Sequence, residues 1–326
     1  MAGNFRLTTP VAFFIFNRPE TTERVFNEIA RAKPPKLLVV GDAARSDRPA
    51  EAGLVADTRA IIDQVDWNCE VLTNFSEQNL GCKRRISSGI DWVFEQVEEA
   101  IMLEDDCLPD PSFFRFCQEM LERYRGDRRI GMISGDNFQL GRGRNEDSYY
   151  FSKYIHIWGW ASWRDRWVGN YDVAMAKWPN LRATSWLADR SGSAREASYW
   201  RSIFDRVHRG EIDTWDYQWA FANWTENRMS ILPALNIISN IGFGASATHT
   251  KGTSDLAGLA ANEIEFPLKH PRAVARDHQA DAFSERRWFR ASLAQRIRNG
   301  IIGWPSCCRR KTSRHTSKAR LAAGSR

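Results

Sequence analysis

Apolar residues in the first 140 positions form short continuous runs separated by amphipathic stretches. The runs are rich in β-branched and aromatic residues and predict buried strands at 11–16, 36–42, 69–75, 100–106 and 129–138. The stretches between them carry apolar residues three or four positions apart and predict helices at 20–32, 58–66, 82–97 and 112–125. Strands that alternate with helices in this way predict an α/β fold with a mixed, mainly parallel sheet flanked by helices.

Polar residues stand where these strands end: Asn17 and Arg18, Asp42, Asn74, and the acidic stretch Glu104–Asp106. Ligands of open α/β sheets bind outside the carboxyl ends of the strands, so these residues should converge on one edge. No G-x-G-x-x-G follows the first strand, and no G-x-x-x-x-G-K-[ST] is present. The sequence therefore argues against a dinucleotide oxidoreductase and a P-loop NTPase.

The acidic stretch places three carboxylates in a row at the mouth of a buried strand. Like charges this close raise each other's pKa unless a positive charge lies among them, and a divalent cation is the simplest candidate. The alternative is a solvated acidic turn that precedes a helix, where Asp is also favoured.

Two segments resemble a known family. The sequence LEDDCLPDPSFFRF (103–116) is similar to the metal-site segment of N-acetylglucosaminyltransferase I, and NLGCKRRISSGI (79–90) is similar to the N-x-G helix of family 2 glycosyltransferases. The resemblance spans roughly residues 9–140 and continues more weakly through 215–219 and 240–250. It implies a GT-A-fold, Rossmann-like glycosyltransferase of the nucleotide-diphospho-sugar transferase superfamily.

On the donor side, the resemblance implies that Mn²⁺ or Mg²⁺ binds Asp106, with His249 as a further metal ligand or a diphosphate contact. It places Asp105 near the ribose or a metal-bound water, and Glu104 behind them. Asp42 would contact the uracil ring, although an Asp after Gly41 is also an ordinary turn residue.

Four polar residues near the strand ends are candidates for nucleotide or phosphate contacts. They are the uncharged Asn17 and the basic residues Arg18, Lys83 and Arg85. Three consecutive basic residues on one helix cannot all face one ligand, so at least one of 83–85 should face solvent.

The acceptor side requires a base that takes a proton from the acceptor hydroxyl. Asp213 and Asp216 are both available in DTWDYQW, and the resemblance points to Asp216. The alternative is a helix N-cap or a surface Asp. His156 is a further candidate for the acceptor cleft.

The chain divides into a nucleotide-sugar-binding half (1–145), an irregular, Trp-rich acceptor and catalytic half of the same domain (146–270), and a basic amphipathic C-terminal segment, partly disordered (271–326). The Trp residues of the second half could stack on sugars, but most are expected in the core.

Charge is distributed unevenly along the chain. Residues 285–326 hold twelve Lys or Arg against one Glu, a surplus of eleven positive charges. The net charge of the whole chain is +6, so residues 1–284 carry a net charge of −5. The basic stretch suits a peripheral contact with an anionic membrane, or a helix packed on the domain followed by a solvated tail. The acidic body argues against nucleic-acid binding. The six scattered Cys, with no signal peptide or membrane span, indicate a cytoplasmic protein, with or without membrane contact.

These observations predict a metal-dependent, inverting glycosyltransferase that moves a sugar from a nucleotide-diphosphate donor, with a UDP-sugar favoured, to a cell-surface glycan or lipid-linked acceptor. The alternatives are a sugar nucleotidyltransferase and a non-catalytic carbohydrate-binding protein with the same fold.

Overall fold

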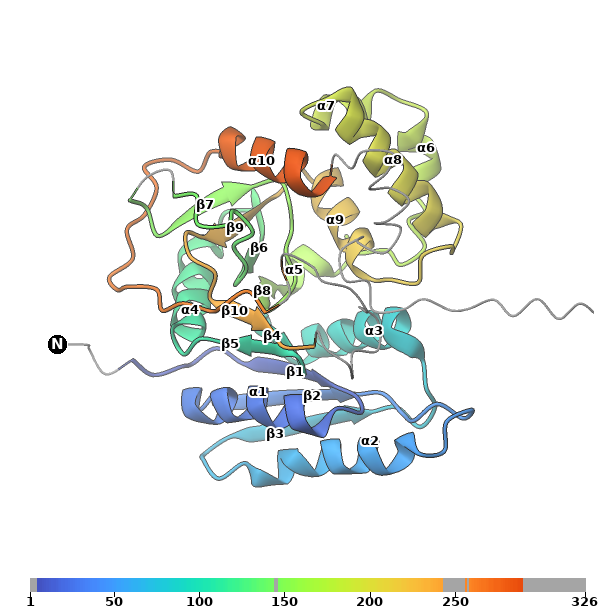
Figure 1. Cartoon of the computed structure of the whole chain (residues 1–326), viewed down its shortest axis with the longest axis vertical. Helices are drawn as coiled ribbons and strands as arrows, with labels where there is room; N and C mark the ends of the chain where they lie inside the picture. Colours follow the sequence, from blue (N-terminus) through green and yellow to red (C-terminus); the bar gives the residue numbers. More distant parts are fainter. Residues whose placement is uncertain (1–4, 144–145, 243–255, 257, 290–326) are drawn as a thin grey trace, which may run out of the picture.

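The computed structural model describes residues 5–143, 146–242, 256 and 258–289. Its centre is an eight-stranded sheet with strand order β3-β2-β1-β4-β8-β6-β9-β7, and β5 and β10 form a separate two-stranded ribbon (Figure 1). The strands are β1 (Val11–Ile15), β2 (Lys36–Gly41), β3 (Glu70–Phe75), β4 (Glu99–Glu104), β5 (Cys107–Pro109), β6 (Ile130–Ser134), β7 (Tyr149–Ser152), β8 (Trp160–Trp163), β9 (Met229–Pro233) and β10 (Ile238–Asn240).

The helices flank this sheet and cluster at one end of it. They are α1 (Pro19–Ala32), α2 (Glu51–Ala60), the 3₁₀ turn η1 (Ile61–Gln64), α3 (Gly81–Gln96), α4 (Ser112–Tyr124), α5 (Arg164–Trp167), α6 (Trp178–Arg182), α7 (Trp186–Arg190), α8 (Ala194–His208), α9 (Asp216–Thr225), α10 (His278–Ser284) and the π-helical turn η2 (Glu285–Phe289).

Strand direction determines which loops meet. Strands β1 to β4 are parallel, β8 is antiparallel to both β4 and β6, and β9 is parallel to β6. Strands β6 and β9 therefore run in the same direction as β4, and only β7 and β8 run the opposite way. The carboxyl ends of six strands consequently lie on one edge of the sheet, as the mainly parallel fold class requires.

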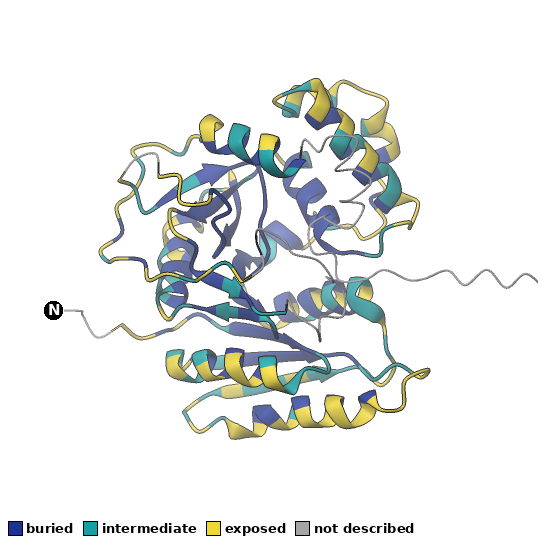
Figure 2. Cartoon of the chain, in the orientation of Figure 1, coloured by how far each residue is buried: buried dark blue, intermediate teal, exposed yellow. Residues whose placement is uncertain are grey.

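Strands β1, β2 and β4 are buried on both faces because helices cover both sides of the sheet, whereas the edge strand β3 is partly exposed. Every residue of β1 is buried, and Figure 2 shows the central strands dark blue between helices whose outer faces are yellow. Helix α1 buries Val25, Phe26 and Ile29 on one side, in the pattern expected from a helix that packs one face on a sheet. The predicted alternation of strand and helix over residues 11–138 is thus confirmed.

Two features differ from the expectation. The helix predicted at 58–66 begins earlier, as α2 at Glu51, and becomes a 3₁₀ turn at Ile61. The second half is more regular than predicted, because β7, β8 and β9 complete the same sheet as β1 to β4. These strands are only four or five residues long, and aromatic residues dominate β7 and β8, so their periodicity is weak.

The Trp residues of the second half form a core, as expected for most of them. The fully buried ones are Trp167, Trp178, Trp200, Trp215, Trp219 and Trp224. The Trp219 ring lies 5.0 Å from Trp167 and 5.9 Å from Trp160, centroid to centroid. Helix α9 is buried along its whole length except at its last residue. Aromatic packing therefore holds α5 and α9 against β8 of the sheet.

Replacing Trp219 by Ala should destabilise the protein by about 3–5 kcal/mol, because it leaves a cavity between two other indole rings. Urea unfolding followed by circular dichroism measures this change in the free energy of unfolding. The control is Val168→Ala, since Val168 is 56% exposed and its loss should change stability by less than about 0.5 kcal/mol. Equal effects of the two substitutions would contradict this assignment of Trp219 to the core.

The first part of the C-terminal segment packs on the domain. Trp288 Nε1 donates to the Phe138 carbonyl over 3.2 Å, and the Phe289 ring lies 4.5 Å from that of Tyr154. Residues 290–326, with most of the basic charge, lie outside the described residues, so membrane contact stays a prediction. Across the described part of the chain, no helix combines the length and apolar content needed to cross a bilayer.

Candidate functional site

The acidic stretch lies at the carboxyl edge of the sheet, where β4 ends at Glu104. Two further carboxylates come to the same edge: Asp136, two residues after β6, and Asp216, the first residue of α9. We call Glu104, Asp105, Asp106, Asp136 and Asp216 the acidic edge. The electrostatic interactions below show that they lie close together.

Arg18 supplies a positive charge to the acidic edge. Its guanidinium forms ion pairs with Asp105 and with Asp106, the latter over 2.8 Å. Asp105 Oδ2 also accepts a hydrogen bond from the Phe16 backbone N–H over 3.1 Å. The end of β1 is thereby tied to the end of β4. Both of these ion pairs go to carboxylates, and the expected contact of Arg18 with a nucleotide stays a prediction.

The Asp106 side chain is more accessible than that of Asp105, with 16% of its surface exposed against 3%. The chain after β10 passes directly over it, since the Ile241 N–H donates to the Asp106 carbonyl over 2.8 Å. A Cβ on Gly242 would lie 2.9 Å from that of Asp106, so glycine is required for this close approach. Residues 243–255, including His249, lie outside the described residues.

Mutual repulsion and burial alter the acid–base behaviour of this edge. Burial raises the pKa of Glu104 to about 8, with Asp106, Asp105 and Asp216 adding to the rise and Arg18 opposing it. Burial also raises the pKa of Cys107 well above its ordinary value, helped by the charges of Asp106, Glu104 and Asp136. Glu104 is therefore largely protonated at neutral pH, and the other carboxyl groups of the edge still outnumber the single charge of Arg18.

Asp216 combines burial with an unused oxygen. Its Oδ1 accepts hydrogen bonds from the Tyr217 N–H over 2.9 Å and from the Thr214 hydroxyl. Its Oδ2 is buried and accepts no hydrogen bond from the described residues. Burial raises the pKa of this carboxyl to about 6. A carboxyl with that pKa can accept a proton near neutral pH.

Asp136 was missed by sequence reasoning. Its Oδ2 accepts from the Trp158 N–H over 2.9 Å, and its Oδ1 is buried without a hydrogen bond among the described residues. Burial raises the pKa of its carboxyl well above the ordinary value. The fifth strand was predicted to run to residue 138, which placed Asp136 inside it, whereas β6 ends at Ser134 and leaves Asp136 just after the strand, as at the other strand ends.

Asp42 holds the start of α3. Its carboxylate accepts from the N–H groups of Ala43, Leu80 and Gly81 over 2.9–3.2 Å, and from the Asn79 amide over 3.1 Å. These bonds satisfy N–H groups that a helix start leaves unpaired. The turn-forming role is thus visible, while contact with a uracil ring stays a prediction.

The three consecutive basic residues 83–85 in the first half of α3 differ in how far they are buried. Arg85 is buried and its guanidinium donates to both the carbonyl and the side-chain oxygen of Asn74, over 2.5 and 2.6 Å. Arg84 is exposed, as expected for at least one member of the run, and Lys83 is half-buried. Nucleotide contacts of Lys83 and Arg85, and of the half-buried Asn17 after β1, stay predictions.

His156 is buried. Its ring lies 4.4 Å from that of Phe138, and burial lowers its pKa to about 3. Asp216 is buried to the same extent, so burial alone does not decide whether His156 lines the acceptor cleft, and that role stays a prediction. Asp213, three residues before Asp216, is half-buried.

The donor set at the acidic edge fits a hard divalent cation with few protein ligands. Mg²⁺ in nucleotide sites typically binds one or two carboxylates and completes its shell with phosphate and water. Asp106 is the partly accessible carboxylate, and Arg18 leaves the edge still negative. Among the described residues, no group of three or more His, Cys, Asp or Glu side chains is arranged to hold a metal without such added ligands.

Comparisons with known proteins give little beyond the fold. No protein-family model matches the chain, and no curated protein matches its sequence. Solved structures that it resembles include UDP-glucose pyrophosphorylase complexed with UDP-glucose, at 12% identity and a TM-score of 0.31, over 48% of this chain and 77% of that one.

HddC from Yersinia pseudotuberculosis is a second similar structure, with 10% identity and a TM-score of 0.28, and its complex with GMP-PN is a third, with 9% and 0.29. Each match covers 48% of this chain and 77% of the other. Scores this low carry no argument about activity, so function must be argued from the site.

Proposed function

We propose that the protein is a glycosyltransferase that moves a sugar from a nucleotide-diphosphate donor to a glycan or lipid-linked acceptor, with a UDP-sugar as the favoured donor. The observation that supports this most is the meeting of the acidic stretch with Asp216 at one sheet edge. Burial raises the pKa of Asp216 to about 6, and its Oδ2 is not used by the described residues. A donor site and a proton acceptor would thus lie side by side.

In this proposal each group has one task. Asp216 accepts the proton of the acceptor hydroxyl as its oxygen forms a bond to the sugar C1 carbon. The bond from C1 to the diphosphate breaks in the same displacement, and the nucleoside diphosphate leaves, so configuration inverts. Arg18 fixes the orientation of Asp105 and Asp106. Gly242 allows the chain that leads to residues 243–255 to lie over Asp106.

Asp106 would hold Mn²⁺ or Mg²⁺, with His249 as a proposed further ligand. A divalent cation at this position supplies Lewis-acid stabilisation of the charge that develops on the diphosphate.

A sugar nucleotidyltransferase is the second candidate, because the sequence left it open as an enzyme with the same fold. Such an enzyme needs a glycine-rich loop that cradles phosphates after the first strand. Here β1 ends at Ile15 and α1 begins at Pro19, and the three residues between them contain no glycine. This short connection favours the glycosyltransferase.

Product analysis separates the two candidates. The full chain is incubated with Mn²⁺ and a panel of nucleotide sugars, and separately with nucleoside triphosphates and sugar 1-phosphates. Release of nucleoside diphosphate in the first reaction supports the proposal. Release of pyrophosphate in the second reaction identifies a nucleotidyltransferase. If neither product is released, the result supports the non-catalytic binding protein.

The transfer rate should fall tenfold per pH unit below about pH 6. The pKa of Asp216 is about 6, so the carboxylate that accepts a proton is depleted as pH falls through that value. The pH profile of kcat/KM measures this. A rate that stays constant down to pH 4.5 would exclude Asp216 as the base.

A further inference from the structure

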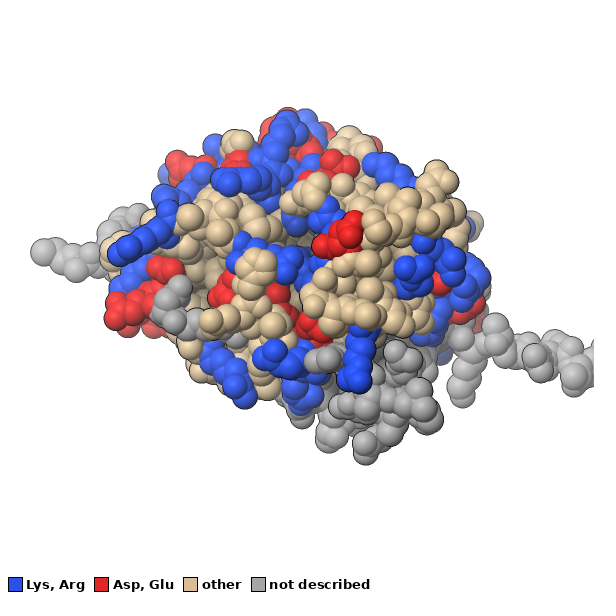
Figure 3. Space-filling model, turned by 90° about the horizontal axis from the view of Figure 1, so that it is seen from above, with Lys and Arg blue, Asp and Glu red and all other residues tan. Residues whose placement is uncertain are grey.

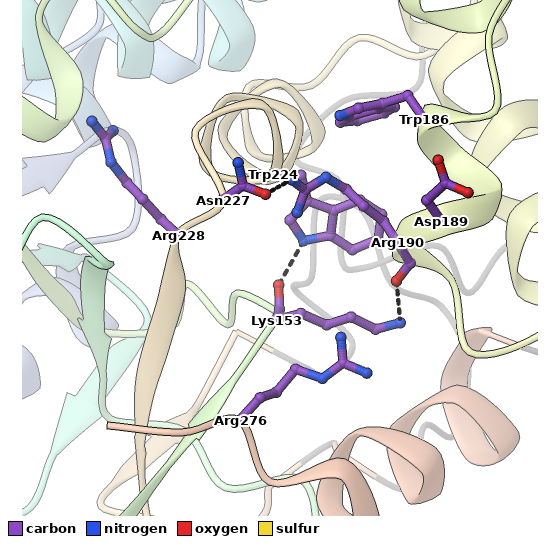
Figure 4. Close-up of a pocket in the computed structure, with 8 residues that line it drawn as sticks. All are labelled: Lys153, Trp186, Asp189, Arg190, Trp224, Asn227, Arg228 and Arg276. Carbon is purple, nitrogen blue, oxygen red and sulfur yellow. Dashed lines mark hydrogen bonds between the residues drawn. The ribbon is translucent and has the colours of Figure 1, made fainter. Parts of the chain in front are cut away.

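A cavity of about 350 Å³ lies at the opposite edge of the sheet and is lined mainly by basic and aromatic side chains. We call it the basic cavity. Its lining residues are Lys153, Trp186, Asp189, Arg190, Trp224, Asn227, Arg228 and Arg276 (Figure 4). This volume is at the lower end of the range for small-molecule sites.

The basic cavity is separate from the acidic edge. Arg228 precedes β9, which runs in the same direction as β4, and Lys153 follows the antiparallel β7, so both lie at the amino-terminal edge of these strands. Asp216 and Trp224 stand at opposite ends of α9, eight residues and thus about 12 Å apart along the axis. A ligand of monosaccharide size in the basic cavity would not reach Asp216.

Two of the cations around the basic cavity already have acidic partners. Lys153 Nζ lies 2.7 Å from Glu196 in a buried ion pair, and Arg276 Nε lies 2.9 Å from Asp281. These pairs fix both cations beside the cavity, and Figure 4 shows Arg276 alongside Lys153.

Arg190 differs, because no carboxylate of the described residues lies within ion-pair distance of it. Its Nη2 donates to the side-chain oxygen of Asn227, and its Nε is buried with no hydrogen-bond partner in the described part of the chain. The central carbon of its guanidinium lies 5.6 Å from the centroid of the Trp186 ring. Burial and the charge of Arg276 both lower the pKa of Arg190, so these two guanidinium groups repel each other.

The other charges nearby do not relieve this repulsion. Asp189 is exposed and accepts a hydrogen bond from the Ser185 hydroxyl over 2.8 Å. In Figure 4 its carboxylate stands beside Trp186, away from Lys153 and Arg276. The Arg228 head points away from the other cations, and its Nη1 donates to the Arg166 carbonyl. Figure 3 shows numerous Lys and Arg side chains on the face seen from above, with smaller groups of carboxylates between them.

We propose that the basic cavity binds an oxyanion, a phosphate or a carboxylate, carried by a molecule of monosaccharide size. Arg190 and Arg276 would hold the oxyanion from two sides, because a guanidinium matches such groups with paired charge-assisted hydrogen bonds. The half-buried Trp186 ring offers a flat apolar face for the sugar. This inference does not depend on the proposed function at the acidic edge.

Calorimetric titration of the full chain tests it, with inorganic phosphate, glucose 6-phosphate, glucuronate and glucose as probes. At least one anionic probe should bind and glucose should not. Arg190→Gln should weaken that binding roughly 10- to 100-fold. Tighter binding of glucose 6-phosphate would identify phosphate as the preferred group, and tighter binding of glucuronate would identify carboxylate.

Two control variants locate the effect. Arg209→Gln removes an exposed arginine that pairs with Glu211 outside the cavity, and it should leave binding unchanged. Asp106→Asn, at the opposite edge, should also leave it unchanged, so failure of the proposed function does not affect this test. If Arg190→Gln does not fold, Arg190→Lys, which keeps the charge but loses the planar fork, should still weaken binding. Absence of binding by every anionic probe, or equal losses in the Arg190 and Arg209 variants, would overturn the inference.

Discussion

Asp216→Asn should lower the transfer rate roughly 10²- to 10⁴-fold, the usual contribution of a positioned general base. The amide keeps an oxygen that can accept from Tyr217 N–H and from Thr214, but it cannot take a proton from the acceptor. Steady-state kinetics with a nucleotide sugar measures the loss. Nucleotide binding, measured separately by calorimetry, should change little, because Asp216 acts on the acceptor.

Asp213→Asn is the matched control, since Asp213 lies three residues earlier and was the other candidate base. It should retain most of the activity. The Asp216 variant should also be at least as stable as the wild type at pH 7. In the wild type, the folded state raises the pKa of Asp216 to about 6, so the ionised carboxylate lowers the free energy of unfolding above that pH. The neutral amide of the variant removes this cost. A loss of activity in the Asp213 variant alone would show that Asp213, and not Asp216, is the general base.

Asp106→Asn should lower turnover roughly 100-fold or more and abolish its dependence on Mn²⁺. Asp106 is the proposed direct metal ligand, and metal stabilisation of a diphosphate leaving group is worth several kcal/mol. The fold should persist, because Arg18 keeps its ion pair with Asp105. Turnover measured across a Mn²⁺ series, for variant and wild type, tests this.

Asp63→Asn removes a carboxylate from the exposed surface of η1 and should leave both turnover and its Mn²⁺ response unchanged. If Asp106→Asn retained the wild-type response to Mn²⁺, the metal would have to bind elsewhere.

The first half of the fold could be predicted largely because β1, β2 and β4 are buried on both faces. The run Val11–Phe16 has no polar member, and β1 is indeed wholly buried. Strands β7 and β8 could not be predicted in the same way, because their aromatic residues suit the core of any element. Their place in the sheet depends on pairing with β9 and β4, which a local pattern does not contain.

The acidic edge was predictable only in part. The triplet at the end of β4 stands out in the sequence, whereas Asp136 depends on β6 running in the direction of β4. A metal ion was expected to supply the positive charge among the carboxylates. The guanidinium of Arg18 also supplies a positive charge there. These two ion pairs join residues that are 87 and 88 positions apart, and no local rule could reveal them.

Calorimetric titration with UDP, in Mn²⁺ and then in EDTA, tests the central claim most directly, with GDP and CDP as comparisons. The account predicts that UDP binds in Mn²⁺, that EDTA removes this binding, and that Asp106→Asn weakens it. Absence of binding by every nucleoside diphosphate, with and without Mn²⁺, would contradict the proposal that the acidic edge is a nucleotide-sugar site.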